Sequence, residues 1–180
     1  PETEVRAMIE DASRRDYAVL VCGRDVVALH NHKPIFDEIF VQALGVNNID
    51  INKPIEPLLS QPVLQLTPFF NEEYEKAIIS SMPHCVSARW HPSFTDITVQ
   101  GADKGNALKQ MTKHLSISLE ECIAFGDGMN DVEMLAEVGK GCIMGNADPR
   151  LVQACPQLEV IGRHGHEAVA SYLRAIFGIY

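Results

Sequence analysis

Two carboxylates and one amide lie within five positions of the stretch CIAFGDGMNDVEML, residues 122–135. Asp127 follows an apolar run, and Asn130 and Asp131 come just before a helical pattern begins. Carboxylate oxygens suit Mg²⁺, and the amide groups at the beginning of a helix favour anions. The stretch does not match a calcium-binding EF-hand loop, which needs more carboxylates and a distant Glu. It predicts a divalent cation and a phosphate held together, with an ordinary turn and helix cap as the plainer alternative.

A second candidate lies upstream, in GADKGNAL. Lys104 opens a predicted helix over residues 104–115, just after a strand-like run. Its ammonium group would supply positive charge to a phosphoryl group and would offset the carboxylates. Taken alone, a lysine at the beginning of a helix is more often a solvated surface residue.

Helices and strands alternate around these residues in the second half of the chain. Amphipathic helices separate the short apolar strands CIAF, GCIMG and LEVIG, and the helix over 104–115 is expected to bury Leu108, Met111 and Leu115. Continuous apolar strands between amphipathic helices indicate a parallel sheet covered on both faces. Ligands bind at the carboxyl ends of such strands, which is where Asp127 is expected.

The first half of the chain mixes hairpin and helix patterns. Residues 17–30 give two apolar runs separated by Gly-Arg-Asp, which is typical of a hairpin. Helical spacing follows at 36–44 and again at 72–81, and VLQLT, CVSARW and FTDITV have the composition of strands. The sequence therefore predicts an α+β unit over residues 1–95, followed by an α/β unit over residues 96–180.

Composition narrows the class of protein. The chain has 180 residues, 46% of them apolar, and a net charge of −9, which argues against nucleic acid or an anionic membrane as the main partner. No apolar run is long enough to span a membrane. The five cysteines include no C-x-x-C pair and lie in apolar segments, which is typical of reduced thiols in a cytoplasmic protein.

Three segments in order, KGNAL, FGDGMNDVEML and GCIMGNA, resemble the haloacid dehalogenase superfamily, and specifically its Cof-like sugar-phosphate phosphatase branch. The resemblance implies a Mg²⁺-dependent phosphatase that acts on a small phosphorylated metabolite. It also implies an α/β fold, with a Rossmann-like parallel sheet core that is incomplete here and a C2-type α+β cap.

The resemblance also implies a role for each candidate residue. Lys104 and Asn130 would contact the transferring phosphoryl group. Asp127 and Asp131 would form the metal site, with Asp127 as the ligand and Asp131 as its support.

Phosphatases of this family attack with an aspartate from a D-x-D-G-T segment, and no such segment occurs in this sequence. We therefore expect a fragment that begins where the cap starts and is inactive alone. Its sheet would have an open edge, so we expect a homodimer, pairing with the missing N-terminal segment, or a rearranged core.

Two alternatives remain open from the sequence. One is a non-catalytic relative that acts as a binding or assembly module. The other is the phosphorylation domain of a cation-pumping ATPase, which also contains G-D-G-x-N-D; the cap-like first half and the lack of a membrane span argue against it.

Overall fold

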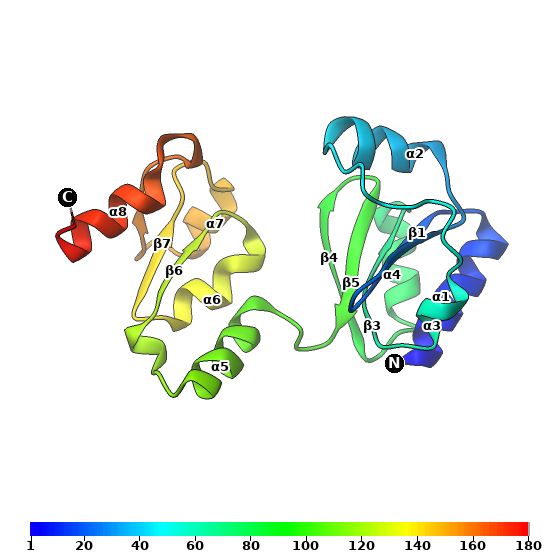
Figure 1. The fold of residues 1–180 in the computed structure, drawn as a ribbon, viewed down its shortest axis with the longest axis horizontal. Helices are drawn as coiled ribbons and strands as arrows, with labels where there is room; N and C mark the ends of the chain where they lie inside the picture. Colours follow the sequence, from blue (N-terminus) through cyan, green and yellow to red (C-terminus); the bar gives the residue numbers. More distant parts are fainter. Residues whose placement is uncertain (180) are drawn as a thin grey trace. The chain divides into compact units, whose positions relative to one another are not determined.

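The computed structural model describes residues 1–179 and divides the chain into two compact units, Pro1–Gln100 and Gly101–Tyr180 (Figure 1). The predicted boundary between residues 95 and 96 lies inside β5 (Phe94–Val99), so the last strand of the first unit extends past it.

The first unit is built on a five-stranded antiparallel sheet in the order β2-β1-β3-β5-β4. The predicted hairpin is confirmed, because Val19 pairs with His30 and Cys22 pairs with Val27. The other three strands, β3, β4 and β5, are the three predicted from composition. The hairpin strands are β1 (Val19–Gly23) and β2 (Val27–His30), and they are followed by β3 (Val63–Pro68) and β4 (Cys85–His91).

Helices pack on both faces of this sheet. On one face, α1 and α4 cover apolar side chains such as Val19, Val21 and Leu66. On the other face, Phe36 and neighbouring residues pack against Leu20 and Phe94. The elements are α1 (Glu2–Arg15), α2 (Pro34–Phe36), the π-helical η1 (Asp37–Ala43), α3 (Glu56–Leu59) and α4 (Glu72–Ile79).

The second unit confirms the predicted parallel sheet. Its strands run in the order β6-β7-β8 and all pair in parallel, with bounds Ile123–Gly126, Lys140–Ile143 and Glu159–Val160. The elements around them are α5 (Lys104–Leu115), η2 (Leu119–Glu121), η3 (Met129–Asp131), α6 (Val132–Glu137), α7 (Pro149–Ala154), η4 (His164–His166) and α8 (Ala168–Phe177). Five buried residues form its core: Ala124, Leu135, Ile143, Leu151 and Cys155.

Helix α5 has the predicted bounds, but the prediction that it buries Met111 and Leu115 is wrong. These residues are 55% and 56% exposed, whereas Gly105 and Thr112 are buried. The helix packs on α6 through its Gly105 side, where a Cβ would lie 3.1 Å from Cβ of Glu133. Its most apolar face is therefore left open within the described residues.

Candidate active site

Asp127 lies at the carboxyl end of the parallel sheet, as the strand pattern predicts. It follows β6 directly, and the turn after β7 is hydrogen-bonded to the backbone of Gly126 and Asp127. The N–H of Met144 donates to the carbonyl of Gly126 at 2.9 Å, and the N–H of Asp148 donates to the carbonyl of Asp127 at 2.8 Å. Parallel pairing therefore fixes where the Asp127 main chain leaves the sheet.

The Asp131 carboxylate connects this loop to α5. Its Oδ2 accepts the N–H groups of Asp127 at 2.9 Å and Gly128 at 3.0 Å, and its Oδ1 accepts a hydrogen bond from Nζ of Lys104 at 2.5 Å. Asp131 is only 2% exposed. The Asp131 side chain packs so closely against the Gly126 backbone that a Cβ on Gly126 would lie 2.6 Å from Cβ of Asp131, and position 126 therefore requires glycine.

Electrostatics favour the ionised form of Asp131. Burial by itself would raise the pKa of this carboxyl group. The hydrogen bond and charge of Lys104, together with the N–H groups of Gly128 and Asp127, outweigh burial and hold the pKa below its ordinary value. Asp131 is therefore a fixed negative charge at neutral pH.

Lys104 is brought to the site by the beginning of α5. Asp103 caps this helix, because its Oδ1 accepts the N–H of Asn106 at 2.7 Å. The Lys104 side chain is 50% exposed, and within residues 1–179 it donates one hydrogen bond, to Asp131. An ammonium group has three donors, so two of them can still bind phosphoryl oxygens.

Asp127 and Asn130 are exposed residues of the loop after β6. The Asp127 carboxylate accepts a hydrogen bond from Nδ2 of Asn146, at 3.4 Å. The structure thus joins Lys104, Asp127 and Asp131 by hydrogen bonds and places Asn130 in the same loop. Sequence reasoning did not single out Asn146, although its position directly after the strand GCIMG could have indicated it.

The oxygen atoms that this loop could offer to a cation fit part of a Mg²⁺ site. Both Asp131 oxygens are engaged by N–H donors, which leaves Asp127 as the carboxylate open to a cation. Within residues 1–179, no group of three or more His, Cys, Asp or Glu side chains could hold a metal ion. Mg²⁺ commonly takes one or two protein carboxylates and completes its shell with water and substrate oxygens.

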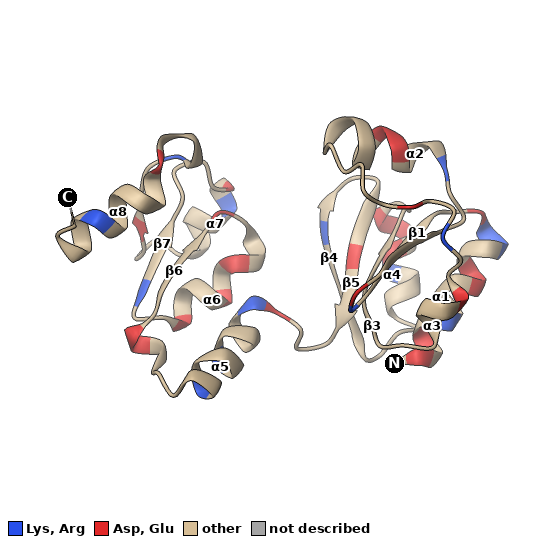
Figure 2. Ribbon diagram, in the orientation of Figure 1, with Lys and Arg blue, Asp and Glu red and all other residues tan. Residues whose placement is uncertain are grey.

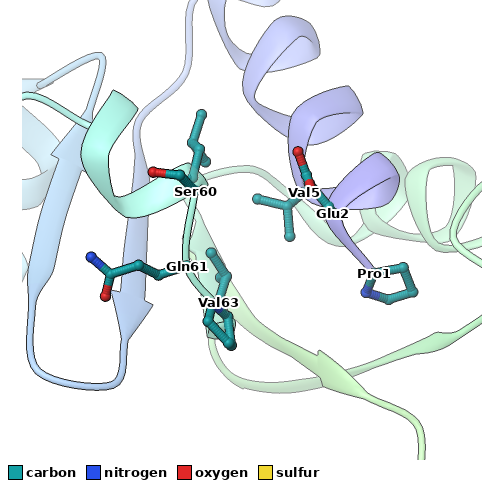
Figure 3. Close-up of a pocket in the computed structure, with 8 residues that line it drawn as sticks. Pro1, Glu2, Val5, Ser60, Gln61 and Val63 are labelled. Carbon is teal, nitrogen blue, oxygen red and sulfur yellow. The ribbon is translucent and has the colours of Figure 1, made fainter.

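A cavity of about 420 Å³ lies elsewhere, in the first unit (Figure 3). It is lined by residues at the beginning of α1, the end of α3 and the beginning of β3, and Glu2 supplies its one carboxylate. None of the candidate residues lines this cavity.

Charged residues are distributed over the elements of both units, with acidic and basic positions interspersed (Figure 2). Among residues 1–179, no helix is both long enough and apolar enough to cross a membrane.

The second unit is a parallel α/β unit in which Lys104 of α5 contacts a carboxylate of the loop after β6, and the first unit is an antiparallel α+β unit. This is the fold expected of a Rossmann-like core with a cap. The chain belongs to the haloacid dehalogenase-like hydrolases, whose family model matches residues 1–173. The family match confirms the predicted superfamily, and the structural likeness to a HAD subclass IIB sugar phosphatase confirms the predicted fold class. HMP-PP phosphatase relatives support the Cof-like branch.

The chain resembles the HMP-PP phosphatase of Yersinia enterocolitica, with 53% identity over 75 residues, 42% of this chain and 28% of that protein. It also resembles the HMP-PP phosphatase of Yersinia pestis, with 50% identity over 78 residues, 43% of this chain and 29% of that protein. Each alignment therefore spans less than a third of the relative's own length.

Solved structures extend the likeness over the whole chain. The sugar phosphatase BT4131, of HAD subclass IIB, is 30% identical with a TM-score of 0.81, covering 100% of this chain and 68% of that one. The phosphatase BT1666 from Bacteroides thetaiotaomicron is 25% identical with a TM-score of 0.82, covering 100% of this chain and 66% of that one.

Proposed function

We propose that the chain is the metal- and phosphate-binding part of a Mg²⁺-dependent phosphatase that acts on a small phosphorylated metabolite. The observation that carries this proposal is the Asp131 carboxylate, which joins the Lys104 ammonium to the N–H groups of Asp127 and Gly128. A preorganised ammonium group beside an open carboxylate is what stabilisation of a transferring phosphoryl group needs. The phosphatase names of the relatives support the same class of reaction.

Each residue has a distinct role in this proposal. The two remaining N–H donors of Lys104 bind phosphoryl oxygens, and the exposed amide of Asn130 donates to the same group. The Asp127 carboxylate holds Mg²⁺, while Asp131 keeps Lys104 and the Asp127 main chain in place. When bound, Mg²⁺ supplies Lewis-acid stabilisation of the negative charge on the phosphoryl group.

The metal site can be tested on the chain as it is. Mn²⁺ added to the ¹⁵N-labelled chain should broaden the amide signals of residues 126–131, and Asp127→Ala should abolish that broadening. Glu120→Ala, at an exposed carboxylate of the same unit, is the matched control and should leave the broadening unchanged. Equal broadening in the Asp127→Ala chain would contradict the proposal.

The nucleophile is the part of the chemistry that these 180 residues do not supply, because they contain no D-x-D-G-T segment. We infer that this chain alone does not hydrolyse phosphomonoesters. An assay with p-nitrophenyl phosphate and Mg²⁺ tests this directly. Turnover that is lost in Asp127→Ala would show that another group attacks, and it would overturn this part of the proposal.

A second candidate function is a non-catalytic binding or assembly module. Within the described residues β6 pairs only with β7, so its other edge is free. Exposed Met111 and Leu115 add apolar surface on α5 of the same unit. Free edges and apolar faces favour association, either as a homodimer or with a segment that carries the nucleophile.

Light scattering over a range of concentrations tests this association. A mass that rises with concentration supports a homodimer. A monomeric mass throughout, with no protection of the β6 amides from hydrogen exchange when a D-x-D-G-T segment is added, would contradict both forms of pairing.

The cellular setting is also part of the proposal. All five cysteines are free, which supports a reducing compartment and hence the cytoplasm. The net charge of −9 and the interspersed charges of Figure 2 support a small metabolite rather than nucleic acid or a membrane as partner.

A further inference from the structure

The side chain of Asn146 bridges the ends of all three parallel strands. Asn146 lies in the turn after β7, between Asp127 after β6 and His164 after β8. Its Oδ1 accepts the backbone N–H of His164 at 2.9 Å, and its Nδ2 donates to Oδ2 of Asp127 at 3.4 Å. Its hydrogen bonds thus connect a candidate metal ligand to a loop that the proposed function does not use.

The two hydrogen bonds fix which way the amide group faces. His164 offers an N–H, so it must meet the carbonyl end of Asn146, and the NH₂ end is then the one that faces the Asp127 carboxylate. If the amide were reversed, oxygen would face carboxylate oxygen and NH₂ would face N–H. Both contacts would become repulsive, so the His164 N–H selects the orientation that Asp127 needs.

The backbone, rather than the Asn146 side chain, holds this turn in position. The N–H of Gly145 donates to the carbonyl of Gly162 at 3.0 Å, and a Cβ on Gly145 would lie 2.7 Å from the carbonyl oxygen of Ile161. The N–H of Asp148 is bonded to the carbonyl of Asp127 on the other side. Asn146 itself is half-buried, so its side chain can be changed with the turn still closed.

We propose that Asn146 is a positioning residue: it holds the Asp127 carboxylate in one orientation for the cation, and the backbone N–H of His164 holds Asn146. This inference rests on the proposed metal-binding role of Asp127. The physical reason is that an exposed carboxylate loses rotational freedom when it binds a cation, and a carboxylate that is already oriented loses less.

The test is the affinity of the chain for Mn²⁺, measured from the broadening of the residue 126–131 amides. Asn146→Ala should weaken Mn²⁺ binding about 10-fold, the scale of effects seen when groups behind a metal ligand are removed. His164→Pro removes the N–H together with the imidazole, and it should weaken binding in the same direction. Pro suits the first position of a helical turn, and Arg163 before it is already extended, with φ −80° and ψ 152°.

Two further variants make the test specific. His164→Ala keeps the backbone N–H and is the matched control, so its Mn²⁺ affinity should equal that of the unsubstituted chain. The double variant Asn146→Ala/His164→Pro should bind Mn²⁺ no more weakly than Asn146→Ala, because the N–H acts through the amide group. Additive losses would overturn the role given to His164.

The outcomes separate this inference from the proposed function. A lower Tm for Asn146→Ala with unchanged Mn²⁺ affinity would mean that Asn146 is only structural, and it would overturn the inference alone. No Mn²⁺ broadening in the unsubstituted chain would overturn the metal site and the inference together.

Discussion

At the scale of single residues, Asp131 joins two parts of the second unit that are distant in sequence. Its carboxylate accepts three hydrogen bonds, from Lys104 on α5 and from the backbone of Asp127 and Gly128 after β6. Asn in its place offers one acceptor oxygen, and its NH₂ group must face either an ammonium or an N–H. The site therefore depends on the charge of this side chain as well as on its shape.

We expect Asp131→Asn to lower the free energy of unfolding by about 2 to 3 kcal/mol, because three partly buried hydrogen bonds to a charged group are lost or weakened. Urea denaturation at neutral pH measures this. Glu120→Gln, at an exposed carboxylate of the same unit, should change the free energy by no more than about 0.5 kcal/mol. Equal effects of the two substitutions would contradict the role of Asp131.

The same carboxylate predicts a pH dependence. The pKa of Asp131 is held below its ordinary value of 3.8 in the folded chain, so the unfolded chain takes up this proton at higher pH than the folded one. The stabilisation is therefore fully present above the ordinary pKa and is lost as pH falls through the lowered one. The difference in unfolding free energy between the unsubstituted chain and Asp131→Asn should shrink below pH ~4. A difference that does not vary with pH would refute this.

Gly126 offers a steric test of the same contact. Because a Cβ there would lie 2.6 Å from Cβ of Asp131, Gly126→Ala must displace the buried carboxylate or the loop. We expect a loss of about 1 to 3 kcal/mol in unfolding free energy. Gly165→Ala is the matched control, since nothing lies within 4 Å of its added Cβ, and it should be close to neutral. Thermal unfolding of the two variants measures this difference, and equal effects would contradict the close contact between Gly126 and Asp131.

At the scale of elements, the open face of α5 makes the next prediction. Met111 and Leu115 are 55% and 56% exposed, whereas Leu151 of α7 is fully buried. Replacing Met111 and Leu115 by Gln should therefore change the unfolding free energy by about 0.5 kcal/mol or less. Leu151→Ala should cost about 2 to 5 kcal/mol.

The α5 variants also report on association. If the α5 face is part of a contact between copies, the double Gln variant should remain monomeric in light scattering at concentrations where the unsubstituted chain associates. A large loss of stability in the monomeric variant would instead mean that this face is buried within the chain.

Element type was largely predictable from the sequence, whereas burial was not. Apolar spacing over residues 104–115 gave the bounds of α5, and the apolar runs gave β6 and β7. The same spacing led to a wrong prediction for Met111 and Leu115, because periodicity shows that a helix has an apolar face and says nothing about what covers it.

The site was predictable only in part, for a similar reason. Asp127 follows a strand, and strand ends are a local pattern. The bond between Lys104 and Asp131 spans 27 residues, and the bond between Asn146 and Asp127 spans 19. Hydrogen bonds over such separations depend on how strands pair and helices pack, and the local spacing of residue types does not reveal either.

At the scale of the whole molecule, the two units have unequal cores. The first has two clusters of buried apolar residues, one on each face of a five-stranded sheet. The second has a single cluster of five buried residues and a three-stranded sheet. Because stabilisation grows with the apolar area removed from water, the first unit should be the more stable of the two.

We therefore expect denaturation in two steps, with the second unit unfolding first. The chain has one tryptophan, Trp90, which lies in the first unit. Its ring centroid lies 4.6 Å from that of Phe94, and its Nε1–H donates a hydrogen bond to Asp96. Trp90 fluorescence reports the first unit alone, whereas far-ultraviolet circular dichroism reports both units. In urea, the dichroism signal should begin to fall before the fluorescence changes. Coincident transitions would contradict the prediction that the first unit is the more stable of the two. If the steps are separate, Leu151→Ala should move the dichroism transition and leave the Trp90 transition where it was, because Leu151 belongs to the core of the second unit.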